Sequence, residues 1–281
     1  MRSKKVYIPL TLLVAWLLFA SGCMKMRMSD AVAKTEFDKA NVAIQFHTFK
    51  IKGNSLHYAV TGLDTLPTLF FVHGSPGSWD AFKEYLKDSL LLTKFRMIAI
   101  DRPGFGYSNF GDAVNLQQQA AIISPLLIKI NNKKPFFLVG HSLGGPLVIK
   151  LAADNPDLFS GIIVLAGSID THQEPKEYWR SLFINNPLKF LLPGAFRPSN
   201  AELWYLKKDL QLLQNDFSKV TCPVYFVHGD KDQFVAYGNM AFGAQALINA
   251  EKIDTITIHN ANHFIPWQHK AEIENLLYHL Y

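Results

Sequence analysis

The sequence predicts an α/β fold: a mostly parallel, doubly wound sheet of about eight strands with an inserted helical cap. Short, continuously apolar runs alternate with segments of helical periodicity from residue 42 to the C-terminus. Such runs are typical of parallel strands covered on both faces, and their alternation with helices is typical of βαβ units. One long stretch without a strand pattern interrupts the alternation and predicts the cap.

The N-terminal residues 1–22 have the pattern of a secretory signal peptide. Arg2, Lys4 and Lys5 precede an apolar run from Val6 to Ala20, and small residues follow. The alternative is a single transmembrane anchor, but the apolar run of about 15 residues is shorter than the ~20 that a bilayer requires. We therefore predict that this segment is removed.

The segment "FASGC" resembles the lipobox of bacterial lipoproteins, with Ala20 where that family usually has Leu. The resemblance implies that Cys23 carries lipid and anchors the protein to a membrane. Met24 and Lys25 lack the Asp that often retains lipoproteins at the inner membrane, so we expect the outer membrane, facing the periplasm. Residues 23–40 are polar and without periodicity, and predict a tether to a domain at 41–281.

Net charge and cysteine content narrow the function classes. The chain has a net charge of +5, which falls to +2 without the three basic residues of the leader, and no basic patch is interleaved with aromatic residues. Nucleic acid is therefore not an expected partner. If Cys23 is lipidated, Cys222 has no partner for a disulfide, and we interpret it as a buried core thiol.

The strands and helices of the domain follow from local patterns. Residues 42–51 and 55–62 predict a hairpin that turns at Gly53-Asn54. Six further strands are expected at 68–74, 95–101, 136–142, 161–167, 224–230 and 254–260. Helices are expected near 79–91, 115–130, 144–154, 237–250 and 268–280. Residues 168–218 contain helical patterns rich in aromatic residues and predict the cap; the alternative is a pair of ordinary helices in the shell of the sheet.

The segment "GHSLG" at residues 140–144 predicts a nucleophile. It follows the apolar run "FFLV" and precedes the helical pattern "GPLVIKLAA". A serine at a sharp strand-to-helix turn needs glycines beside it, because side chains there would collide with the adjoining strand and helix. The alternative is an ordinary turn serine, and the strand–turn–helix context favours a nucleophilic Ser142.

A serine nucleophile needs a base and an acid that orients the base. His263 lies after the last predicted strand and before the last helix, where it can reach the edge of the sheet that carries Ser142. Asp232 follows the preceding strand and can turn back toward His263. Asp230, which we expect to shape the turn, and Asp170 remain the alternatives for the acid.

The loop "VHGSPGSW" at 72–79 predicts one half of an oxyanion hole. The Ser75 N–H can point inward between Gly74 and Gly77, and Leu143, the residue after the nucleophile, supplies the second N–H. We expect His73 to hold this loop by hydrogen bonds. In "IDRPGFGYS", Asp101 and Arg102 are expected to form a structural ion pair or a turn anchor beside the site.

The stretches "HGSPGSW", "DRPGFGYS", "GHSLGG", "HGDKD" and "NANHFIP" occur in the order found in the α/β-hydrolase fold superfamily, which the chain resembles from about residue 42 to its end. The resemblance implies a Ser142–His263–Asp232 triad, no metal and no organic cofactor. Epoxide hydrolases and haloalkane dehalogenases carry Asp in place of Ser142. Prolyl iminopeptidases have another oxyanion loop and a Trp at the position of Leu143. These activities are therefore not expected.

These features lead to a hypothesis of function: a serine hydrolase, carboxylesterase-like, that cleaves carboxylic esters through an acyl-enzyme. Rival reactions of the same fold are hydrolysis of a thioester, lactone, amide or C–C bond, and cofactor-free haloperoxidase chemistry. A rival of another class is a non-catalytic binding lipoprotein. Five cap residues are expected near the pocket or in its supporting core: Trp179, Phe183, Phe190, Trp204 and Tyr205.

Overall fold

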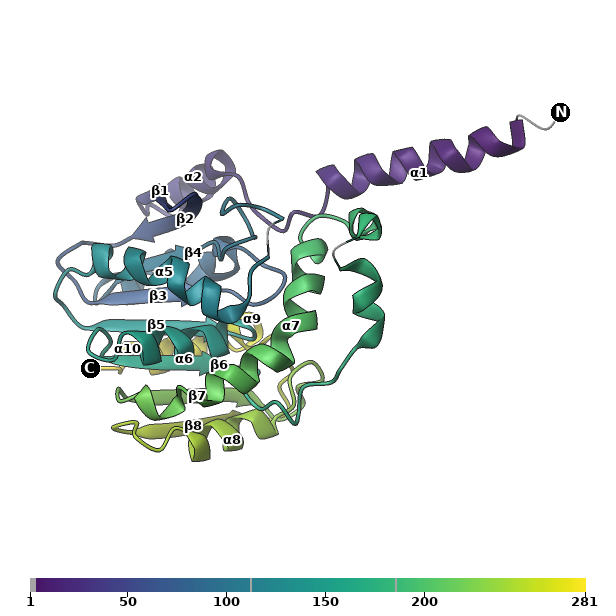
Figure 1. The fold of residues 1–281 in the computed structure, drawn as a ribbon. Coiled ribbons are helices and arrows are strands. Elements are labelled where there is room, and N and C mark those ends of the chain that lie inside the picture. Colours follow the sequence, from purple (N-terminus) through teal and green to yellow (C-terminus); the bar gives the residue numbers. More distant parts are fainter. Residues whose placement is uncertain (1–3, 112, 185) are drawn as a thin grey trace.

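The computed structural model describes residues 4–111, 113–184 and 186–281, so Arg2 of the predicted signal peptide lies outside them. Eight strands form one sheet in the order β1-β2-β4-β3-β5-β6-β7-β8 (Figure 1). They are β1 (Ile44–Ile51), β2 (Asn54–Thr61), β3 (Thr68–Val72), β4 (Arg96–Ile100), β5 (Phe136–His141), β6 (Gly161–Leu165), β7 (Val224–Gly229) and β8 (Ile253–Ile258). This confirms the predicted fold class and strands.

The hairpin of β1 and β2 turns at Lys52-Gly53, one residue before the predicted Gly53-Asn54, and Asn54 begins β2. Lys52 and Gly53 both have positive φ, of 45° and 80°, which a two-residue turn between twisted strands requires. The β1–β2 and β2–β4 pairs are antiparallel, and every later pair in the order is parallel. Antiparallel strands at one edge of a parallel sheet are common in α/β folds.

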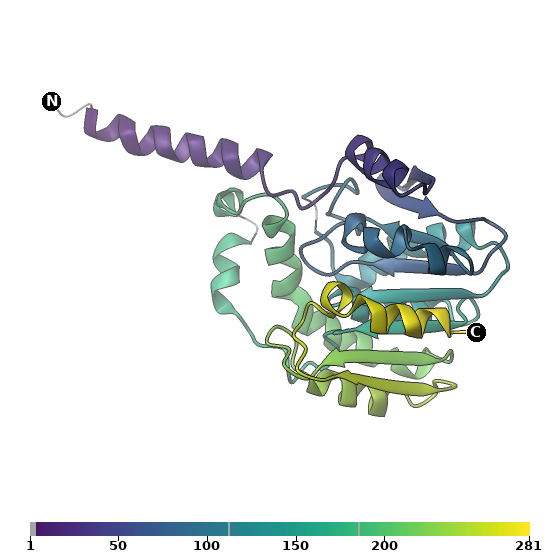
Figure 2. The ribbon, with the colours of Figure 1, turned by 180° about the vertical axis from the view of Figure 1, so that it is seen from behind.

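Helices cover both faces of the sheet (Figures 1 and 2). Neighbouring residues of a strand point to opposite faces, so Phe70 and Val72 enter one hydrophobic cluster while Leu69 and Phe71 enter the other. The first cluster holds α5 (Leu116–Ile130), α6 (Gly144–Asp154) and α8 (Gly238–Ala246). The second holds η1 (Trp79–Phe82), α3 (Lys83–Leu86), α4 (Ser89–Leu92), α9 (Ile265–Gln268) and α10 (Lys270–Tyr278).

Two predicted helices are broken in the structure. The pattern at 79–91 forms η1, α3 and α4, because the Asp88 carboxylate accepts from the N–H groups of Leu90 and Leu91 and caps a new helix. The pattern at 268–280 begins earlier, as α9, and continues as α10 after His269.

The strand order determines where the loops converge. β3 lies between β4 and β5, so the chain leaves β3 toward one side of the sheet and later returns on the other. The loops after β3 and β5 diverge at this switch point and open a crevice at the carboxyl ends of the strands. The loops after β3, β5, β7 and β8 carry the predicted site residues, so the topology brings them to one edge.

The predicted cap lies between β6 and β7 and covers this edge (Figure 2). It contains η2 (Tyr178–Phe183), η3 (Pro187–Leu191), the long α7 (Phe196–Gln214) and η4 (Phe217–Lys219). The pattern "EYWRSLFINNPLKFLLPGAF" thus forms short 3₁₀ segments rather than α-helices. Pro187 lies at the start of η3 and Pro193 after its end, and prolines do not extend a helix that precedes them.

The N-terminal region differs from the expected tether. α1 (Lys4–Gly22) projects from the domain beside the cap (Figure 1), but α2 (Asp30–Lys39) packs on the sheet through buried Ala33 and Phe37. The four-residue spacing of Ala33 and Phe37 places both side chains on one face, which removes them from water. In the described part of the chain, no helix is both long and apolar enough to span a bilayer.

Candidate active site

Ser142 lies at the turn from β5 to α6 with a φ of 55°. Its N–H donates to the Leu165 carbonyl of β6 at 2.9 Å, which fixes the strained turn to the sheet. A Cβ on Gly140 would collide with the Gly144 carbonyl, and a Cβ on Gly144 with the Val72 carbonyl. Both positions therefore require glycine, as the nucleophile-elbow pattern predicted.

His263 lies in the loop between β8 and α9, and its ring is 9 % exposed. Its Nδ1 is 2.7 Å from Oδ2 of Asp232, within the range of a charge-assisted hydrogen bond. In that bond Nδ1–H donates to the carboxylate, which leaves Nε2 as an acceptor for a serine proton. The structure thus brings together the predicted base and the predicted acid.

The Asp232 carboxylate is buried and held by four donors. Oδ1 accepts from the N–H groups of Phe234 and Val235 at 2.8 and 2.9 Å. Oδ2 accepts from His263 and lies 3.2 Å from Nε2 of His228. Burial raises the pKa of this carboxyl, but the hydrogen bonds from His228, His263 and Val235 outweigh burial and hold it well below its usual value. Asp232 is therefore charged at neutral pH.

The two alternative acids have other partners. Asp230 accepts from the Asn260 N–H at 2.7 Å and lies 3.2 Å from the ring of His259, so it stabilises the turn after β8. Asp170 accepts from His172 and Gln173 in the loop after β6. Among the described residues, only the Asp232 carboxylate is bonded to His263.

His141, next to the nucleophile, positions the base. Its Nε2 lies 3.1 Å from the His263 carbonyl, and the two rings are 4.7 Å apart. Burial and the neighbouring His263 together lower the pKa of His141 to about 3. His141 is therefore neutral, and its Nε2–H can donate to that carbonyl. No sequence pattern indicated this role beyond the place of His141 in the elbow.

The two predicted oxyanion donors flank the nucleophile. Gly74 approaches it so closely that a Cβ there would lie 2.9 Å from Cβ of Ser142. Within the described residues, neither the Ser75 N–H nor the Leu143 N–H donates to another group. The Ser75 hydroxyl donates to Oγ of Ser199 on α7, so it is engaged by the cap. Two unpaired N–H groups beside a serine can bind a developing oxyanion.

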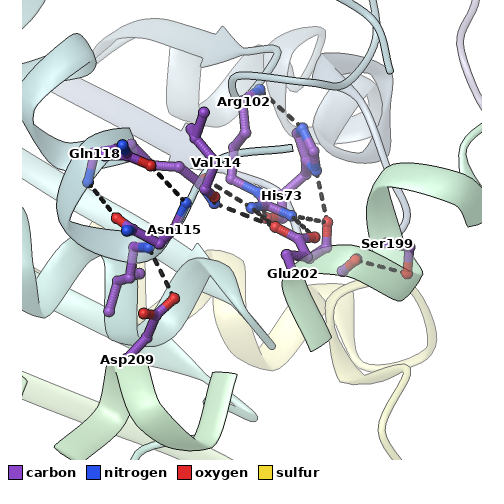
Figure 3. A network of polar contacts seen from close by, with 12 residues as sticks. His73, Arg102, Val114, Asn115, Gln118, Ser199, Glu202 and Asp209 are labelled. Carbon is purple, nitrogen blue, oxygen red and sulfur yellow. Dashed lines mark hydrogen bonds and ion pairs between the residues drawn. The ribbon is translucent and has the colours of Figure 1, made fainter. Parts of the chain in front are cut away.

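Arg102 connects the oxyanion loop to the cap, as Figure 3 shows. Its Nε and Nη2 donate to the carbonyls of His73 and Gly74 at 2.9 and 3.0 Å. Its Nη1 and Nη2 also donate to the two carboxylate oxygens of Glu202 on α7, at 2.8 and 2.9 Å. Gln119 contacts both side chains. Arg102 thus forms the expected structural ion pair, and its partner is Glu202 rather than Asp101.

Two neighbours complete this support. His73 bridges the loops as expected: its Nδ1 is 2.7 Å from the Gly74 carbonyl, and its Nε2 accepts from the Arg102 N–H at 3.0 Å. Burial and the charge of Arg102 lower the pKa of His73 well below its usual value, so the ring is neutral. Asp101 anchors its turn by accepting from the N–H groups of Trp79 and Tyr107 and from the ring of His57.

A cavity of about 570 Å³ opens at the site. Ser142, His263, Ser75 and Leu143 all line it. Its aromatic lining comes from the main domain, namely Phe234, Phe264 and Trp267. None of the five predicted cap aromatics lines the described cavity: Trp204 and Tyr205 border a separate hollow, and Trp179 and Phe190 are exposed. The cap contributes the apolar Leu203 and Leu206 of α7 and the polar Glu174, Glu177 and Arg180.

A metal ion or a reactive cysteine would add to the chemistry available to the protein. Across residues 4–111, 113–184 and 186–281, no three His, Cys, Asp or Glu side chains cluster closely enough to hold a metal ion. Cys222 is buried, and burial raises the pKa of its thiol to about 11. A thiol that stays protonated at neutral pH is a poor nucleophile. Cys23 is exposed.

The sequence of the chain is similar to those of known hydrolases. The family model for the alpha/beta hydrolase fold matches residues 67–191, from β3 into the cap. An uncharacterized hydrolase of Saccharomyces cerevisiae is 28 % identical over 59 % of this chain and 60 % of its own length. Epoxide hydrolase 1 of Caenorhabditis elegans is 27 % identical over 52 % of this chain and 36 % of its own. The chain thus spans under two thirds of these curated relatives.

Solved structures match over a larger share of the chain. A membrane phospholipase A described as a bacterial virulence factor aligns with 99 % of this chain and 98 % of its own, with a TM-score of 0.64 and 16 % identity. An epoxide hydrolase from Vigna radiata covers 84 % of this chain and 96 % of its own, with a TM-score of 0.66 and 17 % identity. The chain thus has the alpha/beta hydrolase fold, and the model of that family matches its residues 67–191.

Proposed function

We propose that this protein is a serine hydrolase that cleaves carboxylic esters. The observation that carries the proposal is the 2.7 Å contact between Asp232 and His263, in a cavity that Ser142 also lines from its strained turn. A buried carboxylate on a histidine, in the same cavity as a serine at a strand-to-helix turn, supports acyl transfer as the reaction.

In the proposed reaction, Oγ of Ser142 attacks the ester carbonyl and Nε2 of His263 takes its proton. Asp232 keeps the proton on Nδ1 of His263 and stabilises the imidazolium. The N–H groups of Ser75 and Leu143 stabilise the oxyanion. His263 then protonates the leaving alcohol, an acyl-enzyme remains on Ser142, and water activated by His263 releases the acid. No step requires a metal or an organic cofactor.

The relatives named epoxide hydrolases suggest another substrate, but the nucleophile argues against it. A serine that opened an epoxide would form an ether, which water does not cleave under these conditions. A carboxylate nucleophile would form an ester, which water can cleave. With Ser142 at the elbow, an acyl substrate is the one whose covalent intermediate turns over. Thioesters, lactones and amides remain substrates that the same residues could process.

Labelling with a fluorophosphonate tests the proposal, because the probe reacts only with an activated serine. Wild-type protein should label, and Ser142→Ala should not label and should lose ester hydrolysis by about 10⁶-fold. Ser168→Ala is the matched control, because Ser168 also lines the cavity but its hydroxyl donates to Glu174 at 2.6 Å. Wild-type protein that never labels would point to a non-catalytic binding protein. A panel of esters, thioesters, lactones and amides then ranks the substrates.

We also propose that Cys23 is lipidated and holds the protein at the outer membrane, facing the periplasm. The basic start, the apolar run, the small residues before Cys23 and the exposure of this cysteine support the proposal. Such a location would place the enzyme among lipids and their esters.

A further inference from the structure

The outer surface of the cap carries an unusual number of exposed apolar side chains. They lie on η2 and η3 and are between 47 % and 69 % exposed. We call this surface the cap face; it consists of Tyr178, Trp179, Leu182, Leu188 and Phe190. A contiguous exposed patch of this kind generally marks a contact with another protein or with a membrane.

Cations lie over the aromatic rings of the cap face. Their distances from the ring centroids run from 4.6 to 5.4 Å, and the pairs are Lys176 with Tyr178, Arg180 with Trp179, and Lys189 and Arg197 with Phe190. Aromatic rings mixed with Lys and Arg are typical of surfaces that lie at the boundary between lipid headgroups and acyl chains. Lys176 and Lys189 favour an anionic bilayer, because the core of a protein–protein interface is depleted of lysine. Arg180 is already paired with Glu177 and does not distinguish the two kinds of partner.

The N-terminal segment places a membrane anchor against this same cap. The Ala195 N–H donates to the Met24 carbonyl at 2.9 Å, and a Cβ on Gly194 would collide with the carbonyls of Cys23 and Met24. Before removal of the signal peptide, the Trp16 indole of α1 also donates to the Leu191 carbonyl at 2.9 Å. A lipid on Cys23 would thus lie beside the cap.

The chain after Cys23 gives the domain little freedom to move away. The Met26 carbonyl accepts from the Ser78 hydroxyl at 2.7 Å, and the Arg27 guanidinium lies 4.0 Å from the ring of Tyr107 and bonds the Gly106 carbonyl. A lipid on Cys23 would therefore be attached almost directly to the folded domain, not through the long tether that the sequence predicted. The membrane would have to lie within a few residues' reach of the cap.

From these contacts we infer that the cap face docks on an anionic bilayer and that the catalytic cavity takes its ester from that bilayer. The second half of this inference rests on the proposed function. The docking itself depends only on the cap face, its cations and the attachment of the N-terminal segment. Docking would hold the cap, and the cavity beneath it, at the depth where ester bonds of lipids lie.

The test uses the full chain in vesicles of phosphatidylcholine with and without phosphatidylglycerol. Brominated acyl chains should quench a fluorescence component that disappears in Trp179→Phe, and more strongly when phosphatidylglycerol is present. This readout needs no enzymatic activity. Quenching of the Trp179 component no greater than that of the buried Trp79 would overturn the docking.

A second readout compares two substrates in the same vesicles. The double variant Leu182→Glu/Leu188→Glu should hydrolyse a bilayer ester on the order of tenfold more slowly, because charged side chains oppose insertion. Its hydrolysis of a soluble short-chain ester should match wild type. Ile128→Glu and Ile248→Glu are the controls, since both residues are exposed but lie on α5 and after α8, away from the cap. All variants keep the same anchor and should pellet with the vesicles.

The outcomes separate the two proposals. If wild-type protein hydrolyses no soluble ester but Trp179 is quenched, the proposed function fails and the docking stands. If the double variant and the controls behave alike on the bilayer ester, the docking is wrong. A dimer that buries the cap face and dissociates in the double variant, with no quenching of Trp179, would also overturn it.

Discussion

Arg102 and Glu202 form a two-point ion pair inside the protein, with nitrogen–oxygen distances of 2.8 and 2.9 Å and almost no exposed surface on either side chain. One partner follows β4 and the other lies on α7 of the cap. The same guanidinium donates to the His73 and Gly74 carbonyls, directly before the proposed oxyanion donor Ser75. The position of the cap is thereby coupled to the geometry of the oxyanion loop.

Glu202→Gln tests this coupling. The variant keeps the shape of the side chain but leaves the buried Arg102 charge uncompensated, which should lower the free energy of unfolding by about 3–5 kcal/mol. If Arg102 also positions the loop, kcat on a short ester should fall by about 10- to 100-fold with little change in KM. The reason is that the oxyanion forms in the transition state and is absent from the bound substrate. Urea unfolding and steady-state kinetics measure the two effects.

The exposed pair of Lys252 and Asp254 is the control, with a distance of 2.7 Å. Lys252→Gln should leave both stability and kcat unchanged, since solvent screens an exposed ion pair. A Glu202→Gln variant that is less stable but has wild-type kcat at a temperature where it is folded would show that the pair is structural only.

The sequence predicted the central strands because they are fully buried, and a fully buried strand must be apolar along its whole length. β3, β4 and β5 have every residue buried. α2 was missed because only Ala33 and Phe37 of its ten residues are buried, so its apolar signal is weak. Ser29, whose side chain accepts from the Val32 N–H, is an N-cap signal that could have revealed it.

The candidate site was predictable where chemistry limits the choice of residue. Ser142 needs neighbouring glycines, and those are visible in the sequence. The partner of Arg102 was not predictable, because a buried arginine needs a carboxylate but nothing local identifies which one, and Glu202 lies 100 positions away. The orientation of the cap aromatics was also not predictable, because no local sequence pattern around Trp179 distinguishes a residue that faces the cavity from one that faces outward.

Asp232→Asn should lower kcat by up to ~10⁴ near neutral pH, because an amide no longer favours the productive tautomer of His263. Asp230→Asn is the matched control on the same loop. Its carboxylate bonds Asn260 and His259 rather than His263, so kcat should stay close to wild type. Ester hydrolysis by both variants at pH 7.5 measures the difference. Equal losses of kcat would mean that the loop, and not the Asp232 carboxylate, matters.

Substrate chain length should depend on the aromatic residues of the main domain rather than on those of the cap. Phe234→Ala and Trp267→Ala remove side chains that line the cavity and should change relative kcat/KM among esters of increasing acyl length by ~1–3 kcal/mol at most. Trp204→Ala removes a cap residue outside the described lining and should leave that profile unchanged. If Trp204→Ala alone altered the profile, the cap would be the element that determines specificity for acyl length.

Cys23→Ser should abolish lipid attachment, because the thiol is the proposed acceptor of the lipid. The protein should then be released in soluble form or held by an uncleaved α1. Mass spectrometry of the mature N-terminus measures the modification directly, and Cys222→Ser is the control because that thiol is buried in the core. An unmodified Cys23 in wild-type protein would exclude the lipoprotein assignment and leave α1 as the membrane contact.

Asp209 should make the protein less stable as pH rises through the weakly acidic range. Burial raises the pKa of its carboxyl to about 6, and the Glu202 carboxylate adds to the shift, although the Leu116 N–H donates to Oδ2 at 3.0 Å. The folded protein therefore holds this proton more tightly than the unfolded chain, whose carboxyl titrates near ~4. The contribution is fully present below pH ~4 and is lost as pH rises through about 6.

Asp209→Asn keeps an acceptor for the Leu116 N–H but cannot ionise. Its free energy of unfolding should exceed that of wild type at pH 7.5 by on the order of 1–2 kcal/mol, and the two should converge near pH 4. Asp216→Asn is the opposite case. Burial raises the pKa of Asp216, but hydrogen bonds from Lys219 and Lys150 outweigh burial and lower it. The free energy of unfolding of Asp216→Asn should therefore be lower than that of wild type at pH 7.5. If the free energy of unfolding of Asp209→Asn is also lower than that of wild type at pH 7.5, the Asp209 carboxylate stabilises the fold in its charged form.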